Sequence, residues 1–303
     1  MPDIMGDMDI AFPNLGIYLE NVPKSFSIFG FTVAIYGLII GIGVLLAVIL
    51  ISHIAKITDQ NADDYWDLSP WLVVLSVIGA RVYYVIFAWD MYKDNPISVF
   101  YIRNGGLAIY GGILTGIVVM FVYTRIKKMS FLKVADTVVY GVVLGQIMGR
   151  WGNFANREAF GEYTNNLFAM RLPQAAVRAN EITDLMKANI VEGTNYIQVT
   201  PTFLYESMWN ICVLVVMLLY LKHKKFNGEI FLLYLFGYGV GRFWIESLRT
   251  DQLIAPILNV PVSMIVAATF VIVAVVFDIL GRKKAKSSAD AETHAVEDSG
   301  EEQ

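Results

Sequence analysis

The stretch that decides the fold runs from Val134 to Gly161 and reads VADTVVYGVVLGQIMGRWGNFANREAFG. Its first half is apolar and continuous enough to form a helix across a bilayer core of about 30 Å, which requires about 20 helical residues. Its second half carries arginine, asparagine and glutamate. A charge near the middle of a membrane costs at least about 2.5–3.5 kcal/mol, so such residues usually face protein or water and mark a functional site. The stretch therefore predicts a spanning helix with a site at its end.

The whole chain shares this apolar character. Of its 303 residues, 56% are hydrophobic and 17% are charged, whereas about 45–50% apolar residues are usual in soluble domains. The apolar runs are continuous and do not alternate with period two, which favours helices over barrel strands. We expect an all-α integral membrane protein of about seven transmembrane helices. The predicted spans are 28–51, 66–88, 105–124, 134–153, 201–221, 230–247 and 256–280.

Basic residues in the connecting segments predict the orientation. Short loops on the cytoplasmic side of membrane proteins carry an excess of lysine and arginine. Placing the N-terminus outside and the C-terminus in the cytoplasm puts the larger basic set on the inner side. That set is Lys56, Arg125, Lys127, Lys128, Lys133, Lys222, Lys224, Lys225, Arg282, Lys283, Lys284 and Lys286. Half of the outer basic residues lie in one long loop, where the rule has least force.

This topology divides the chain into five parts. Residues 1–25 form an extracytoplasmic N-terminal segment, 26–157 the first four helices with the polar motif, and 201–282 the last three helices. Residues 158–200 are too long for a simple connection and predict a small extracytoplasmic cap, with a short helix within 175–189 and an extended segment at 193–199. Beyond Lys286 the chain is acidic and rich in small side chains, so residues 283–303 are predicted to form a disordered cytoplasmic tail.

The polar end of the fourth span suits a phosphate group. On a helix, Arg150, Asn153 and Arg157 fall at positions i, i+3 and i+7 of one face, although the neighbouring glycines can unwind its end. A guanidinium offers a fixed fork of donors to phosphoryl oxygens, and asparagine can orient a hydroxyl or ester group. The alternative is an interfacial arginine that reaches toward lipid headgroups. Its Gly, Asn and Glu neighbours favour a site.

The sixth span repeats this pattern. Tyr238, Arg242, Glu246 and Arg249 are spaced by four, four and three residues, so they form a polar stripe on an apolar helix. The glycines at 237, 239 and 241 allow close approach of a neighbouring helix or a lipid. The alternative is structural, because Arg242 and Glu246 at i and i+4 can neutralise each other.

Four further residues support a cavity between several helices. Glu206 lies near the start of the fifth span and is either a helix cap or a catalytic group. Tyr110 lies between two glycine pairs at the start of the third span. Arg81 is expected to form a structural salt bridge with another helix, and Tyr36 is either a core aromatic or part of the cavity.

The stretch from Gly149 to Gly161 closely resembles the defining motif of the phosphatidylglycerol–prolipoprotein diacylglyceryl transferases. The resemblance covers roughly residues 10–280. Further matches occur in the family's order: Tyr36-Gly37, Gly79-Ala80-Arg81, Gly105-Gly106-Leu107, Pro201-Thr202, Tyr205-Glu206, Tyr238-Gly239, Arg242, Glu246 and Arg249.

The resemblance implies an enzyme of the bacterial plasma membrane that catalyses the first step of lipoprotein maturation. It transfers the sn-1,2-diacylglyceryl group of phosphatidylglycerol to the lipobox cysteine of a prolipoprotein and releases glycerol phosphate. The implied partners are phosphatidylglycerol, prolipoprotein signal peptides with a lipobox cysteine, and membrane lipid. No cofactor, metal or nucleic acid is implied.

One residue departs from the family's pattern. Many members carry a histidine in the Gly-Gly segment of the third span, where this chain has Tyr110. In the predicted topology His53 and His223 lie on the cytoplasmic side and His294 in the tail. We therefore expect no histidine base at an outward-facing site.

The site hypothesis follows from the arginines and the missing histidine. We expect Arg150 and Arg242 to bind the lipid phosphate and to stabilise the charge of the leaving group. Glu158 or Glu246 is expected to accept the thiol proton, the alternative for either being to position an arginine. The remaining expected site residues are Asn153 and Asn156, which orient the headgroup, Tyr36 and Tyr110, which shape the cavity, and Gly161, Tyr238 and Arg249 in the lipid-binding set.

Other functional classes fit the sequence less well. A secondary transporter would also place charges in the membrane, but no repeated half with matching broken helices is visible. A metal hydrolase would need more ligands than three histidines and one cysteine provide. No Gly-x-Ser-x-Gly elbow marks a serine hydrolase. A purely structural membrane protein has no evident use for arginines on three spans.

Overall fold

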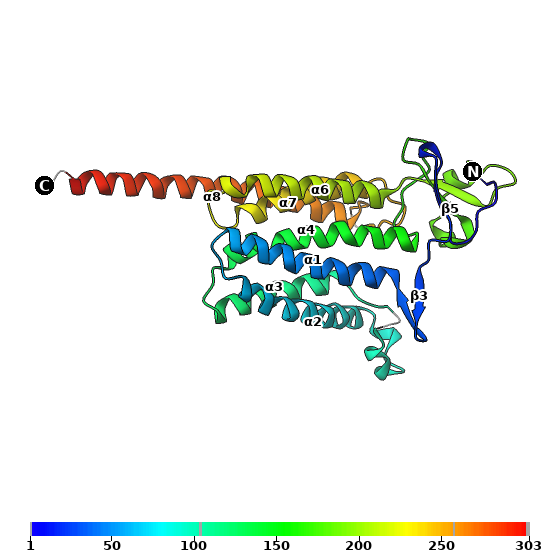
Figure 1. Ribbon diagram of the computed structural model, residues 1–303, viewed down its shortest axis with the longest axis horizontal. Helices are drawn as coiled ribbons and strands as arrows, with labels where there is room; N and C mark the ends of the chain where they lie inside the picture. Colours follow the sequence, from blue (N-terminus) through cyan, green and yellow to red (C-terminus); the bar gives the residue numbers. More distant parts are fainter. Residues whose placement is uncertain (1, 103–104, 257, 301–303) are drawn as a thin grey trace. The chain divides into compact units, whose positions relative to one another are not determined.

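The computed structural model describes residues 2–102, 105–256 and 258–300, with side chains described through residue 287. The chain divides into two compact units, one comprising Met1–Ala47 and Val139–Gln303 and the other Val48–Val138. The main helices are α1 (Ile35–Ile57), α2 (Ala62–Phe87), α3 (Ile109–Ile126), α4 (Phe131–Asn156), α6 (Thr202–Tyr220), α7 (Glu229–Glu246) and α8 (Val262–Gly300). Figure 1 shows them along the chain.

Among the described residues, six helices are long and apolar enough to cross a membrane, namely α1, α2, α3, α4, α6 and α8. Only 11% of the most apolar stretch of α8 is buried by the protein, which fits an apolar surface in contact with lipid. The protein is thus an integral membrane protein whose spanning part is all-α, as expected, while the described residues outside it also form β-strands. The remaining expected span, the sixth (230–247), corresponds to α7, which is outside this set because it carries Glu229, Arg242 and Glu246. That α7 also crosses the membrane stays a prediction.

The first expected span is wrong in its first turns. Residues 28–34 belong to a hairpin of β3 (Ser25–Ile28) and β4 (Phe31–Ala34), and the helix begins only at Ile35. Phe29 and Gly30 both have positive φ angles, at 50° and 82°. A two-residue hairpin turn of this kind needs positive φ at both central positions. The apolar composition of the strands concealed them, since periodicity does not separate short apolar strands from helix ends.

Glycines on α7 bring three helices of the first unit close together. A Cβ at Gly241 would lie 2.1 Å from the Trp209 ring of α6, and a Cβ at Gly239 would lie 2.8 Å from the Ala267 carbonyl oxygen of α8. The close approach of α7 to neighbouring helices is therefore confirmed. α6, α7 and α8 lie side by side (Figure 1).

The cap contains a four-stranded antiparallel sheet in the order β2-β1-β5-β6. Its strands are β1 (Ile10–Phe12), β2 (Ile17–Leu19), β5 (Met170–Pro173) and β6 (Tyr196–Val199). The N-terminal segment and the 158–200 region, expected as separate parts, thus share one sheet. The expected short helix and extended segment correspond to α5 (Asp184–Ala188) and β6.

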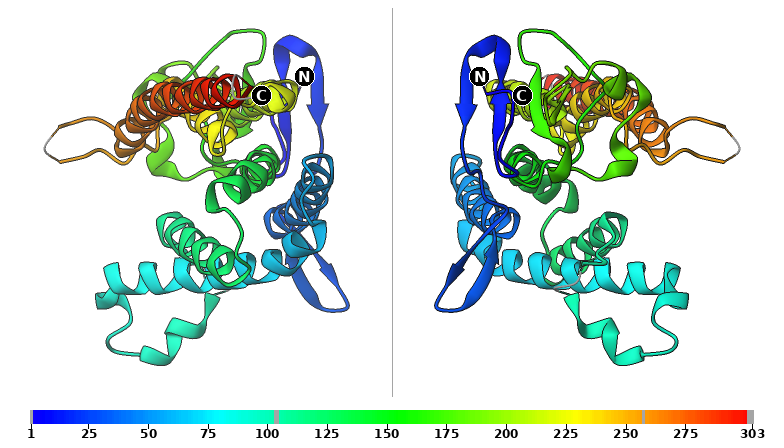
Figure 2. Two further views of the ribbon diagram at one scale, coloured as in Figure 1. Left: turned by 90° about the vertical axis from the view of Figure 1, so that its left-hand side faces the viewer. Right: turned by 90° about the vertical axis from the view of Figure 1, so that its right-hand side faces the viewer.

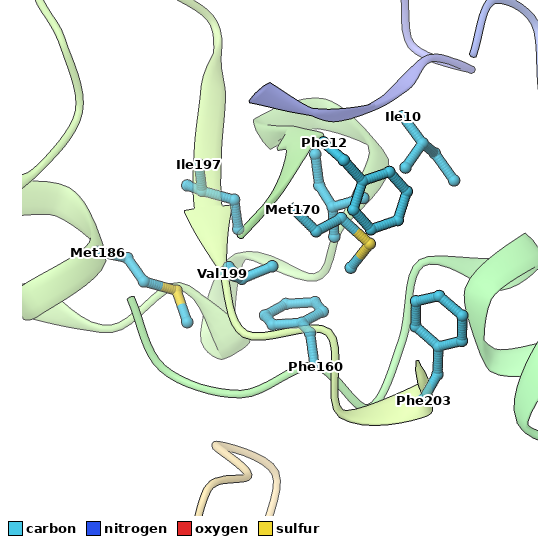
Figure 3. Packing of buried hydrophobic residues seen from close by; sticks show 9 residues of the cluster. Ile10, Phe12, Phe160, Met170, Met186, Ile197, Val199 and Phe203 are labelled. Carbon is cyan, nitrogen blue, oxygen red and sulfur yellow. The ribbon is translucent and has the colours of Figure 1, made fainter. Parts of the chain in front are cut away.

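One apolar core joins the cap to the helices. Phe160, at the end of the motif, and Phe203, on the first turn of α6, pack with Phe12 and Met170 of the sheet (Figure 3). Phe160 is 2% exposed and Phe203 is 4% exposed. Burying each such ring stabilises the fold by about 1.5–3 kcal/mol, so this core holds the end of the motif and the start of α6 in place.

In the second unit, α2 and α3 pack side by side (Figure 2). A Cβ at Gly111 would lie 2.5 Å from the Gly79 carbonyl oxygen, so only glycine permits this contact. The expectation of a salt bridge for Arg81 is wrong. Its guanidinium instead donates to the carbonyl oxygens of Ser98, Val99, Gly105 and Gly106 at 2.7–3.0 Å. Carbonyl dipoles satisfy the buried cation, and the bonds to Gly105 and Gly106 hold the residues that lead into α3.

The C-terminal tail differs from the expected disordered segment. α8 continues from the apolar span to Gly300, and residues 301–303 lie outside the described residues. Alanine, lysine and glutamate favour helix, so a helix already formed in the span continues through them.

Asp9 anchors the N-terminal segment of the cap. Its buried carboxylate accepts bonds from the Gly6 and Asn21 backbone N–H groups and the Tyr18 hydroxyl. The bond from Tyr18 and the two backbone bonds outweigh desolvation and lower the pKa of Asp9, while the same bond raises the pKa of Tyr18 to about 12. A lowered carboxyl pKa contributes stability above the ordinary value of about 3.9, and this contribution is lost as pH falls through the native pKa.

We predict that Asp9→Asn makes the cap susceptible to limited proteolysis at neutral pH. The native protein should become susceptible only below about pH 4, where Asp9 is protonated. Asp7→Asn, at an exposed residue in the same segment, is the matched control. Equal cleavage rates for both variants at pH 7 would show that the Asp9 bonds do not hold this segment.

Candidate active site

The end of α4 supplies the first polar group of the site. The helix stays regular through Gly152 and ends at Asn156, so the glycines do not unwind it. Arg150 donates to Asn153 Oδ1 at 3.2 Å. The chain then turns back, and Glu158 Oε1 accepts bonds from Asn153 Nδ2 at 3.0 Å and Asn156 Nδ2 at 3.3 Å. The two asparagines thus hold Glu158 beside Arg150.

The predicted i+7 position of Arg157 on this face is wrong. Arg157 has a φ of 57° and lies beyond the helix. Its side chain is 2% exposed and donates to the carbonyl oxygens of Met8, Val22 and Ala155. Arg157 therefore ties the N-terminal segment to the end of the motif through both of its Nη groups.

Glu206 is the centre of the site. One oxygen of its carboxylate lies 2.8 Å from Arg150 Nη2, and the other lies 3.2 Å from Arg242 Nη1. Its side chain is 4% exposed. Glu206 therefore links an arginine of α4 to an arginine of α7 from its position on α6. Among the described contacts, its carboxylate bonds these arginines and no backbone N–H group at the start of α6, which favours a role in the site over the cap alternative.

The network continues along α7. Glu246 Oε2 lies 2.7 Å from Arg242 Nη2 and 3.8 Å from Arg249 Nη1. Arg249 also donates to both oxygens of Asp251 at 2.8 and 2.9 Å. Burial acts to raise the pKa of Asp251, but the bonds from Arg249 outweigh it and lower that pKa. Asp251 is therefore ionised at neutral pH.

We call these groups the arginine–carboxylate network. It contains three arginines and four carboxylates: Arg150, Arg242, Arg249, Glu158, Glu206, Glu246 and Asp251. Among the described contacts, Glu158 is paired with amide groups rather than an arginine. The self-neutralising pair that was the alternative for Arg242 and Glu246 is present, but it belongs to a network that spans three helices.

An aromatic ring borders the network. Tyr36, near the start of α1, lies against Gly152, where a Cβ would come within 2.5 Å of the tyrosine ring. Because Gly152 has no side chain, the Tyr36 ring can pack directly against α4 at this position, which lies between Arg150 and Asn153 in the sequence. This position agrees with a role for Tyr36 in shaping the cavity, which stays a prediction.

Two other expected lipid-binding residues have different surroundings. Tyr238 stacks on Tyr234, with ring centroids 5.6 Å apart, one turn before Arg242. Gly161 donates its backbone N–H to the Thr200 carbonyl oxygen, and a Cβ there would lie 2.5 Å from the Leu248 carbonyl oxygen. The structure thus gives Gly161 a role in joining three chain segments, and lipid binding by either residue stays a prediction.

The sequence profile of a family described as prolipoprotein diacylglyceryl transferase matches residues 23–280. The chain belongs to the prolipoprotein diacylglyceryl transferase family. Three similar proteins are each named phosphatidylglycerol–prolipoprotein diacylglyceryl transferase. That of Enterococcus faecalis is 41% identical over 86% of this chain and 90% of its own length. Those of Finegoldia magna and Clostridioides difficile are 38% and 36% identical, over 86% and 88% of this chain and 96% and 98% of their own lengths.

Membership of the prolipoprotein diacylglyceryl transferase family gives the motif residues a common context. Arg150, Arg242, Glu158 and Glu246 all lie in the network or are bonded to it. Tyr110 belongs to the other unit, on the first turn of α3, and is 41% exposed. Its part in the site stays a prediction.

Two members of the network were not predicted as such from the sequence. Glu206 was open as a cap or a catalytic group, and Asp251 was not among the candidates. For Glu206 a signal was available, because a carboxylate inside an apolar span is costly unless a cation on another helix compensates it. Asp251 carried no such signal, because it follows the end of α7 among polar residues.

We predict that Glu206→Gln lowers the thermal stability of the purified protein. The amide keeps the shape of the side chain but loses the negative charge that compensates two guanidinium groups. Breaking a buried ion pair typically costs about 3–5 kcal/mol. Glu192→Gln, at an exposed glutamate of the cap, is the control. Indistinguishable unfolding midpoints for the two variants in detergent would contradict the bridging role.

Proposed function

We propose that this protein transfers the sn-1,2-diacylglyceryl group of phosphatidylglycerol to the lipobox cysteine thiol of prolipoproteins, the first step of lipoprotein maturation. The observation that carries the proposal is the pair of arginines on α4 and α7 that share Glu206 at the family's motif. The relatives' names supply the donor and the acceptor.

The paired guanidiniums fit a phosphodiester. Arg150 and Arg242 each contact one oxygen of Glu206, so their donors already converge on a two-oxygen anion. A phosphate presents a similar pair of oxygens to fork-shaped donors. In the proposed complex the lipid phosphate takes over part of these contacts, while Asn153 and Asn156 orient the headgroup. Glu206 is a positioning residue that holds the two arginines the right distance apart.

The reaction exchanges one bond at the glycerol C3 carbon. The acceptor sulfur attacks that carbon, the bond from C3 to the phosphate oxygen breaks, and the thiol proton leaves to a base. Glycerol phosphate departs with one more negative charge than the diester carried. Arg150 and Arg242 stabilise this developing charge, which is the differential stabilisation that accelerates the step.

The charge balance of the network favours Glu158 as the base. Its carboxylates outnumber its arginines by one, and Glu158 contacts amides rather than a guanidinium. Among the described contacts, its carboxylate can therefore turn to the thiol without breaking an ion pair with an arginine. Glu246, paired with Arg242 at 2.7 Å, fits better as a group that orients that arginine.

The proposal places the reaction on the extracytoplasmic side of the bacterial plasma membrane. The distribution of basic residues supports this orientation, with the cap outside and the end of α8 in the cytoplasm. The signal peptide then presents its cysteine at the membrane boundary, where α4 ends and the network lies.

The direct test measures transfer of radiolabelled diacylglyceryl from phosphatidylglycerol to a synthetic lipobox peptide by purified protein in detergent. We expect label on the cysteine peptide and none on a matched serine peptide. Folded protein that labels neither, alongside an active relative, would overturn the proposal.

We predict that Arg150→Ala and Arg242→Ala each reduce transfer by at least about 10²–10³-fold, the usual effect of removing one preorganised charge-stabilising group. Arg178→Ala, at a cap arginine whose side chain is 70% exposed, should leave transfer near normal. Near-normal transfer by either network variant would refute the phosphate assignment.

We predict that Glu158→Gln and Glu246→Gln differ in their pH profiles. Without its base, Glu158→Gln should lose about 10²–10⁴-fold in rate at pH 7 and recover as pH rises toward the thiol pKa of about 8.5, because thiolate then forms in solution. Glu246→Gln should be impaired to a similar extent at every pH. Parallel profiles for the two variants would remove Glu158 from the role of base.

A further inference from the structure

A preformed groove lies next to the network within the first unit. Its cavity of about 680 Å³ falls in the size range of ligand sites, about 300–1,000 Å³. The lining comes from residues 162–164, Asn166, Thr183 and Thr200 of the cap, from Tyr205 on α6, and from residues 247–250 and Gln252 after α7.

Backbone hydrogen bonds fix the walls of the groove. Glu162 N–H donates to the Leu248 carbonyl oxygen at 3.2 Å, and Thr200 N–H donates to the Glu162 carbonyl oxygen at 3.0 Å. Asn166 Nδ2 of the cap donates to the hydroxyl of Tyr205, near the start of α6, at 2.8 Å. Segments far apart in sequence are thus held in one arrangement before any ligand binds, which lowers the entropy cost of binding.

The chemistry of the lining favours a neutral polar ligand. Its one arginine, Arg249, is held by Asp251, and its one carboxylate, on Glu162, accepts bonds from the Thr183 hydroxyl and the Tyr163 N–H. The remaining lining residues are mostly hydroxyl and amide side chains. A phosphate site would need cations in excess, and an acyl-chain site would need apolar walls. Threonine, serine, asparagine and glutamine match the donors and acceptors of a peptide backbone.

Arg249 connects the groove to the network, since it also lies 3.8 Å from Glu246. We propose that this groove binds the extended polypeptide that follows the acceptor cysteine of the prolipoprotein, mainly through its backbone. The inference rests on the proposed function, because it assumes that the cysteine reacts at the arginines. The apolar segment of the signal peptide precedes the cysteine. The polypeptide that follows the cysteine then leaves the membrane directly along the groove.

The test compares two lipobox peptides, one ending in an amide at the cysteine and one continuing for six residues. Native protein should show a KM about tenfold lower for the longer peptide, equivalent to about 1.4 kcal/mol, as expected for a few added hydrogen bonds. Ser247→Trp fills the groove from an exposed position at the end of α7. It should abolish this difference while leaving the KM of the short peptide unchanged.

Two matched variants complete the design. Ser247→Ala keeps the groove open, and Ala188→Trp adds the same ring at an exposed cap residue outside it; both should retain the tenfold preference. Equal KM values for the two peptides with native protein, or a Ser247→Trp variant that keeps the preference, would overturn the groove assignment while transfer itself stands. A Ser247→Trp effect of equal size on both peptides would likewise overturn it. Absence of transfer to either peptide by native protein would instead refute the proposed function.

Discussion

The bridge that Glu206 makes between Arg150 and Arg242 is the interaction on which the site depends. Two guanidinium groups from different helices repel each other, and neither is tolerated in an apolar span without compensation. A single carboxylate from α6, 4% exposed, satisfies both and fixes the positions of α4, α6 and α7 around it. The same geometry lets the arginines receive another two-oxygen anion, so the contact that stabilises the ligand-free protein also prepares it for a phosphate.

The rest of the first unit keeps this bridge in place. Glycines of α7 allow Trp209 of α6 and the backbone of α8 to pack closely against it, which holds the helix that carries Arg242 in position. At the other end, Phe160 and Phe203 share the apolar core of the cap, so the end of the motif and the residues just before Glu206 are held by one cluster. Burial of these rings offsets the cost of assembling several charges near a membrane.

The sequence was sufficient where a pattern is local. Continuous apolar runs predicted the spanning helices, and four-residue spacing predicted that Arg242 and Glu246 share a face of α7. It failed where the outcome depends on partners distant in the chain: Arg157 turns to backbone carbonyls of the N-terminal segment, and Arg81 to the loop before α3. The Phe29-Gly30 hairpin was missed because its turn is set by φ angles that the apolar composition does not reveal.

The most direct measurement is a structure of the protein determined in a lipid nanodisc with phosphatidylglycerol. The account predicts the lipid phosphate within hydrogen-bonding distance of both Arg150 and Arg242, with Glu206 displaced from at least one of them. A phosphate bound elsewhere, with both contacts of Glu206 unchanged at 2.8 and 3.2 Å, would contradict the assignment of these arginines to the lipid headgroup.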